Sequence, residues 1–144
     1  MACDIVVAAE KARFVSAFGQ LGLLPDCGGT ASFPRTMGLS NAMAFTLLGE
    51  GLPATLAAQR GVIWKALPDD EFAAEVERIA AKLGSGSVAA MVATKNALRE
   101  SLKRDWADQR KLESAAQGVL GRTSDHLEGL AAFREKRRPR FAQQ

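Results

Sequence analysis

Apolar residues in the first half of the chain form short unbroken runs, and these runs predict short strands. DIVVA, at Asp4–Ala8, has the composition of a strand buried on both faces of a parallel sheet. A second short strand is predicted at Phe14–Phe18, and VIWKA predicts another at Val62–Ala66. Parallel strands need neighbours that are reached through crossovers, so we expect the missing neighbours upstream of Met1 or on another chain.

Helical patterns fill the rest of the sequence and dominate its second half. After Asp70, the apolar residues Phe72, Val76, Ile79 and Leu83 follow one another at the spacing of one helix face. The expected helices start at capping or helix-opening residues, which are Ser40 (ending at Gly49), Pro53 (running to Gly61), Asp69 or Asp70, Ser87, Asp105, and Thr123 or Ser124. The pattern therefore predicts an α/β fold in which helices predominate.

Composition places the chain among ordinary globular proteins. Its 144 residues are enough to form one hydrophobic core. Hydrophobic and charged fractions of 47% and 24% are those of a folded chain rather than a disordered one. No apolar run is long enough for a membrane span, and the start MACDIVVAAEKAR lacks the basic region of a signal peptide. Cys3 and Cys27 have neither metal-ligand spacing nor the density of a disulfide framework. We expect a cytoplasmic protein with no membrane partner and no metal.

The net charge of +3 is mild, but basic residues cluster near the C-terminus in REKRRPRF. One interpretation is a solvated helix end whose cations suit the helix dipole. Another is a site for the phosphate of a small ligand. A nucleic-acid interface would spread its charge over a face and interleave aromatic residues, which this sequence does not do. We therefore expect no nucleic-acid partner.

The stretch LGLLPDCGGTASFPR places one acid, Asp26, on a turn between Pro25 and the pair Gly28-Gly29. Proline fixes φ, and glycine adopts conformations that other residues avoid. On such a turn, Asp26 is either the cap of a helix, worth about 1 kcal/mol, or a functional carboxylate. The turn alone leaves both interpretations open.

Four segments in chain order carry a family resemblance: ACDIVVAAEKARF, LGLLPDCGGTASFPRTMG, LLGEGLPATLAAQRGVI and EGLAAFREKRRPRF. Together they resemble the crotonase superfamily of enoyl-CoA hydratases and isomerases, and the match corresponds to the C-terminal half of a family member. FVSAFGQLGLLPDCGG is most similar to the phenylacetate-degradation branch, which isomerises a ring-opened or epoxide-bearing acyl-CoA. The resemblance implies a spiral of βαβ units over residues 1–66 and a C-terminal helical trimerisation region over residues 67–144.

The resemblance assigns the chemistry to Asp26. Family members stabilise a thioester enolate between two backbone N–H groups while carboxylates move protons at the adjacent carbons. Hydratases carry two glutamates; the equivalent of one lies upstream of Met1, and the other aligns with Phe18, which cannot exchange protons. Asp26 aligns with the acid/base aspartate of isomerase-type members. An acyl-CoA isomerase is therefore expected, with a hydratase or a non-catalytic remnant that binds CoA or a full-length homologue as alternatives.

The same resemblance suggests binding residues. Phe18, Leu24 and Pro25 are expected to line the acyl pocket, although simple core packing explains each equally well. Phe133 and Lys136 match positions that reach a neighbouring subunit's CoA in family trimers, where an aromatic suits the adenine and a cation its phosphate. Lys136 as a merely solvated residue remains an alternative. The expected partners are an acyl-CoA thioester and further copies of the chain, with coenzyme A as part of the substrate rather than a cofactor.

Both oxyanion-hole donors of the family belong to segments upstream of the part that aligns with this chain. We therefore expect no isomerase activity from the 144-residue chain alone, and recovery with a complementing N-terminal half, unless Gly28 and Gly29 provide a substitute. His126, the only histidine, is expected at the surface, and Cys27 has no histidine base that would make it a nucleophile.

Overall fold

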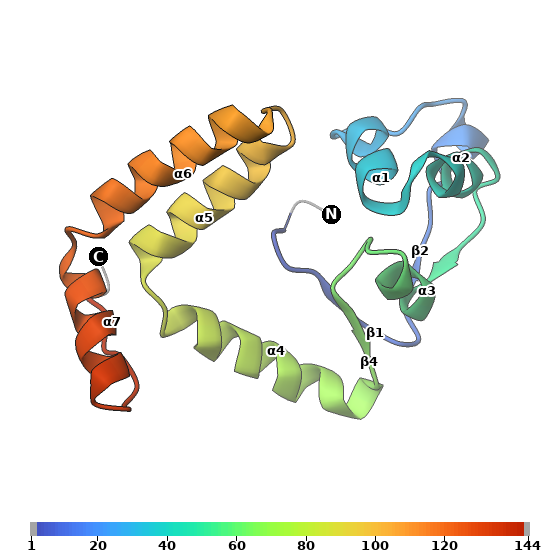
Figure 1. The fold of residues 1–144 in the computed structure, drawn as a ribbon. Helices are drawn as coiled ribbons and strands as arrows, with labels where there is room; N and C mark the ends of the chain where they lie inside the picture. The colour runs from blue at the N-terminus through green and yellow to red at the C-terminus, as the bar shows by residue number, and fades with distance from the viewer. Residues whose placement is uncertain (1–2, 143–144) are drawn as a thin grey trace. The chain divides into compact units, whose positions relative to one another are not determined.

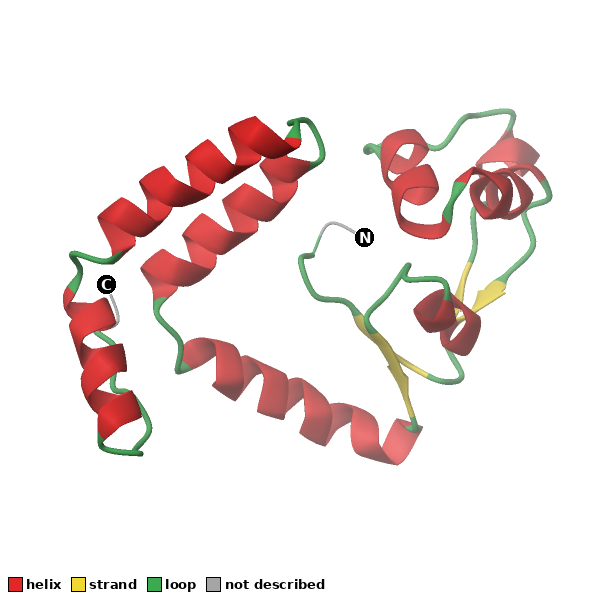
Figure 2. Cartoon of the chain, viewed as in Figure 1, coloured by secondary structure: helices red, strands yellow, loops and turns green. Residues whose placement is uncertain are grey.

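The computed structural model describes residues 3–142, and the chain divides into two compact units, Met1–Arg78 and Ile79–Gln144. The described residues form seven α-helices, one short 3-10 helix and four short strands. Helices account for most of the regular structure, as Figure 2 shows in red. The predicted predominance of helices is therefore confirmed.

The strands of the first unit form two separate pairs. β1 (Val7–Ala9) lies parallel to β4 (Lys65–Leu67), and the pairing is continued by the Trp64 N–H, which donates to the Val6 carbonyl at 2.8 Å. β2 (Arg13–Phe14) is antiparallel to β3 (Leu52–Pro53). Each pair thus joins segments about forty to sixty residues apart in sequence, which fixes the fold of this unit.

Three strand predictions were wrong in their extent. Of the predicted strand Asp4–Ala8, only Val7 and Ala8 are in β1, which ends at Ala9. Only Phe14 of the stretch Phe14–Phe18 is in a strand, and a 3-10 helix, η1 (Phe18–Leu21), follows it. In the predicted strand Val62–Ala66, the N–H of Val62 bonds back to the carbonyl of Ala57 at 2.9 Å. Because the chain still closes the preceding helix at this point, β4 starts three residues later, at Lys65.

The three helices of the first unit are α1 (Gly29–Met37), α2 (Leu39–Leu47) and α3 (Ala54–Gln59). The sequence analysis missed α1, in which Pro34 lies inside the helix. Packing explains this helix, because the ring of Phe33 meets that of Phe45 edge to face at a centroid distance of 5.3 Å.

The predicted start of α2 was also wrong. Gly38, rather than Ser40, precedes the helix, and Ser40 lies in its first turn. The prediction for α3 is confirmed, because Pro53 is the residue at its N-terminal cap.

The core of the first unit is built from small and medium side chains on these elements. Its buried members are Ala8, Met37, Ala42, Phe45, Leu52, Ala54, Ala57, Val62 and Ile63. Ala54 and Ala57 are fully buried, so α3 packs closely against its neighbours.

Four longer helices complete the chain: α4 (Asp69–Gly84), which crosses the division between the units, α5 (Val88–Ser101), α6 (Trp106–Leu120) and α7 (Ser124–Arg134). The predicted caps are confirmed for three of them. Ser87, Asp105 and Thr123 each accept a hydrogen bond from a backbone N–H in the first turn of the following helix. α5 and α6 lie side by side, and Gln109 Nε2 donates across this contact to the Ala97 carbonyl at 3.2 Å.

A carboxylate network joins β4 to α4 within the first unit. Glu75 accepts from Lys65 Nζ at 2.9 Å and from the guanidinium of Arg78. Hydrogen bonds from Arg78 and then from Lys65 lower the pKa of Glu75 to about 2. Because this pKa is depressed, the network stabilises the fold above the ordinary carboxyl pKa, and this contribution is lost as the pH falls toward 2.

Phe45→Ala tests the core of the first unit. Phe45 is 8% exposed and stacks on Phe33, so its truncation should lower the free energy of unfolding of this unit by about 3 kcal/mol. Denaturant unfolding followed through Trp64 fluorescence, in a Trp106→Phe background, measures it. The control Leu47→Ala, on the same helix but 74% exposed, should change stability little. Equal effects of the two substitutions would contradict this description of the core.

Candidate active site

The turn Asp26–Gly29 precedes α1 and has an uncommon backbone. The N–H of Gly29 donates to the Asp26 carbonyl at 2.8 Å, and the two central residues, Cys27 and Gly28, have φ values of 49° and 81°. Positive φ at both central positions is characteristic of a type I′ turn, which ordinarily takes Asn, Asp or Gly there. Cys27 is one of only two non-glycine residues with positive φ in the described part of the chain.

Asp26 does not cap α1. Gly28 occupies the N-terminal cap position of the helix, and within residues 3–142 no backbone N–H donates to the Asp26 carboxylate. The Asp26 side chain is exposed and lies against the thiol of Cys27. A hydrogen bond with Asp26, and next its negative charge, raise the pKa of the Cys27 thiol, which disfavours the thiolate. Of the two interpretations of Asp26, the structure excludes the cap of α1.

The other predicted acyl-pocket residues lie on the segment leading to this turn. Phe18 opens η1 and is partly buried, and its carbonyl accepts from the N–H of Leu23 at 2.9 Å. Leu24 is 71% exposed, whereas Pro25 is half-buried beside the start of α1. Core packing therefore does not account for Leu24, which presents an apolar surface two residues from Asp26.

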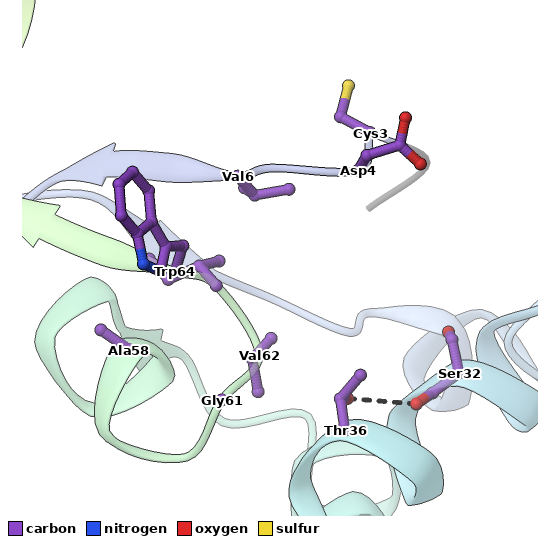
Figure 3. A pocket seen from close by; sticks show the side chains of 10 residues that line it. Cys3, Asp4, Val6, Ser32, Thr36, Ala58, Gly61, Val62 and Trp64 are labelled. Carbon is purple, nitrogen blue, oxygen red and sulfur yellow. Dashed lines mark hydrogen bonds between the residues drawn. The ribbon is translucent and has the colours of Figure 1, made fainter. Parts of the chain in front are cut away.

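A cavity of about 470 Å³ in the first unit is elsewhere. Figure 3 shows Ser32 and Thr36 of α1 on one side of it and residues of the α3–β4 connection, including Trp64, on the other. Its lining residues are Cys3, Asp4, Val6, Ser32, Thr36, Ala58, Gly61, Val62, Ile63 and Trp64. None of the four predicted acyl-site residues lines this cavity, so the structure does not bring them together around it.

The oxyanion alternative at the glycine pair is not supported. The Gly29 N–H is already used in the turn, at 2.8 Å from the Asp26 carbonyl oxygen. Gly29 also packs tightly, because a Cβ there would lie 3.1 Å from both the Phe33 ring and Pro25. This N–H therefore closes the turn and is not available to a substrate oxygen.

Phe133 and Lys136 lie at the end of α7, in the second unit. Phe133 is 84% exposed, and Lys136 follows the helix with a φ of 53°. The N–H of Arg137 donates to the Ala132 carbonyl at 3.0 Å, and that of Lys136 to the Phe133 carbonyl at 3.3 Å. These two bonds form a Schellman motif, whose left-handed position is usually glycine.

Glu128 fixes the chain after this motif. Its carboxylate accepts from Arg137 Nη1 at 2.6 Å, from Arg137 Nη2 at 3.0 Å and from the Arg140 N–H at 2.7 Å. The hydrogen bonds from Arg137, and then from the Arg140 backbone, lower the pKa of Glu128 to about 2. The sequence analysis missed this residue, because a pairing nine positions apart matches no local helical spacing.

Three other observations limit the chemistry of the described residues. His126 is exposed, as predicted, and both cysteines are free and exposed. Residues 3–142 contain no group of three or more His, Cys, Asp or Glu side chains that could hold a metal ion. Among these residues there is also no helix of the length and apolarity needed to cross a membrane.

The family model for enoyl-CoA hydratase/isomerase matches residues 1–144. A probable enoyl-CoA hydratase of Rhodobacter capsulatus is 43% identical over 98% of this chain and 55% of its own length. A 1,2-epoxyphenylacetyl-CoA isomerase of Escherichia coli is 39% identical over 96% of this chain and 53% of its own length. A trans-2-decenoyl-[acyl-carrier-protein] isomerase of Streptococcus mutans is 34% identical over 98% of this chain and 54% of its own length.

Solved structures agree with these relatives. An enoyl-CoA hydratase from Polaromonas sp. superposes with a TM-score of 0.92 at 30% identity, over 98% of this chain and 55% of that one. A putative enoyl-CoA hydratase/isomerase from Mycobacterium abscessus superposes with a TM-score of 0.92 at 32% identity, over 99% of this chain and 55% of that one. The chain therefore belongs to the enoyl-CoA hydratase/isomerase family and has a crotonase-like fold. It spans about half the length of the relatives it matches.

The contact between Asp26 and Cys27 makes a prediction about thiol reactivity. In a Cys3→Ser background Cys27 is the one remaining thiol, and Asp26→Asn removes the charge that raises its pKa. More thiolate should then form, so alkylation by iodoacetamide at pH 8 should be faster, on the order of two- to threefold. A matched variant, Asp70→Asn in the first turn of α4, should leave the rate unchanged. Equal rates in Asp26→Asn and the parent would contradict the contact.

Proposed function

We propose that this chain contributes the proton-transfer group of an acyl-CoA isomerase, and that Asp26 is this group. The observation that carries the proposal is the exposed Asp26 carboxylate, which caps no helix and follows the exposed apolar residues Leu23 and Leu24 in sequence. A carboxylate that is not needed for the fold, on a turn with strained backbone, is typical of a functional residue.

The chemistry follows from one carboxylate acting twice. The Asp26 carboxylate removes a proton from a carbon next to the thioester, and the electron pair of the broken C–H bond moves into the thioester as an enolate. The resulting carboxylic acid returns the proton to another carbon, and the double bond shifts with no net gain or loss of atoms. The enolate oxygen needs hydrogen-bond donors. We propose that a complementing N-terminal half supplies them, because the Gly29 N–H is engaged in the turn.

Phe18 favours isomerisation over hydration. Adding water across a double bond needs one group to activate the water and another to protonate carbon. At Phe18 this chain has an apolar ring where the resemblance places a glutamate in hydratases. Among the relatives, both an epoxyphenylacetyl-CoA isomerase and a decenoyl isomerase support this choice, while a probable hydratase is also similar. We further propose an aromatic acyl group of the phenylacetate type, with Phe18, Leu24 and Pro25 beside it.

The CoA end of the substrate is proposed to bind at the end of α7. The exposed ring of Phe133 suits stacking on adenine, and the Lys136 ammonium suits the neighbouring phosphate. By the family resemblance, these two residues would serve the site of a neighbouring subunit in a cytoplasmic homo-oligomer.

Asp26→Asn tests the proposed function. Asparagine keeps the shape of the side chain but cannot accept the proton, so kcat for double-bond migration should fall about 10²–10⁴-fold while the Kd for the acyl-CoA changes little. Both are measured on the chain assembled with a complementing N-terminal half. Asp70→Asn, remote from the turn, is the matched control. Undiminished turnover in Asp26→Asn would rule out the proposed role.

A further inference from the structure

The chain after α7 folds back along that helix and is held at several points. Arg137 and the Arg140 N–H both bond to the Glu128 carboxylate, and the Ala142 N–H donates to Asp125 Oδ1 at 3.1 Å. Phe141 lies over Gly129, where an added Cβ would be 3.8 Å from its ring. We call residues 137–142 the folded-back tail. Several of its hydrogen bonds end on two carboxylates in the first half of α7, those of Asp125 and Glu128, so the helix and the tail form one local structure.

Lys136 lies at the point where the chain reverses. It has a left-handed backbone with a φ of 53°, which a lysine adopts less readily than a glycine. The Schellman bonds to the Ala132 and Phe133 carbonyls hold Lys136 in this conformation, and the bonds of Glu128 to the Arg137 side chain and the Arg140 N–H hold the residues that follow it.

The reversal separates the basic residues into two groups. The guanidinium of Arg137 forms ion pairs with Glu128 and Glu135. Arg134, Lys136 and Arg138 are exposed, and within residues 3–142 no carboxylate pairs with them. Like Phe133 they are exposed residues at the end of α7, and an aromatic ring with cations near it in sequence suits an aromatic base that carries a phosphate group.

We propose that Glu128 is a positioning residue for this surface: by holding the folded-back tail, it keeps Lys136 in the conformation that presents its ammonium to a phosphate monoester. The inference rests on the proposed CoA site and adds to it a residue that does not touch the ligand. Glu128 contributes here through Arg137 and the Arg140 N–H, not through its own charge near the ligand.

Glu135 provides a matched control for Glu128. Both carboxylates pair with the same guanidinium, that of Arg137. Only Glu128 also accepts the Arg140 N–H, and the Glu135 side chain is 60% exposed against 25% for Glu128. The two Glu→Gln substitutions make the same change of charge, but only Glu128→Gln removes the carboxylate that accepts both the Arg137 guanidinium and the Arg140 N–H.

The test compares the binding of CoA with that of dephospho-CoA, which lacks the 3′-phosphate, by calorimetry on the purified chain and its variants. We expect the unsubstituted chain to prefer CoA by about tenfold, and Lys136→Ala to abolish most of that preference. Glu128→Gln should reduce the preference to about twofold with little change in dephospho-CoA affinity, whereas Glu135→Gln should keep it. A purely structural role would instead weaken both ligands alike, and circular dichroism checks that each variant is folded.

The failures of the two proposals are distinguishable. If Lys136→Ala lowers the preference for CoA and Glu128→Gln does not, the positioning role is overturned and the CoA site stands. If Glu128→Gln weakens both ligands equally, the positioning role is also overturned. If neither Lys136→Ala nor Phe133→Leu affects either ligand, the CoA site is overturned, and the positioning role with it.

Discussion

The absence of space around Gly29 is the constraint on which the candidate active site depends. A Cβ at this position would lie 3.1 Å from Phe33 and from Pro25, so a larger residue at the start of α1 would require these neighbours to shift by a few tenths of an ångström. The turn closes through the Gly29 N–H, and its two central residues take positive φ. As a result Asp26 lies outside the helix it precedes, and its carboxylate meets the Cys27 thiol rather than the helix N–H groups. Phe33 also packs edge to face against Phe45, so the start of α1 is connected to the core.

Two carboxylates act as acceptors for distant parts of the chain, one in each unit. Glu75 joins α4 to β4 through Lys65, and Glu128 joins α7 to the folded-back tail through Arg137. In both, several donors converge on one carboxylate, and the pKa of each falls to about 2. Exposed surface ion pairs usually contribute little, and it is the convergence of donors that gives these two their structural role. Large apolar side chains such as Trp106, Val119 and Phe133 stay exposed, which is typical of surfaces that other protein segments or ligands cover.

Local signals made the helices of the second half predictable. Ser87, Asp105 and Thr123 are capping residues followed by regular apolar spacing, and each bonds to the first turn as expected. α1 could not be predicted in this way, because Pro34 and the glycine pair favour a turn locally, while the contact with Phe45 lies outside the segment. The predicted strand boundaries were wrong for a related reason, because the hydrogen bonds that shorten the strands come from elsewhere in the chain.

The sequence predicts candidate residues for the site but not the geometry around them. The family resemblance led to Asp26, but its contact with Cys27 follows from a left-handed backbone that cysteine rarely adopts. Phe133 and Lys136 were found in the same way, while Glu128 was not, because its partners lie nine and twelve residues away along the chain.

The most direct test of the central claim, that one carboxylate at Asp26 supports isomerisation and not hydration, is mass spectrometry of the reaction product together with proton NMR, which locates its double bond. The chain is assembled with its complementing half and given an unsaturated acyl-CoA. The account predicts a product of the same mass as the substrate with its double bond moved. A product heavier by one water molecule, formed at the same rate when Asp26 is asparagine, would contradict it.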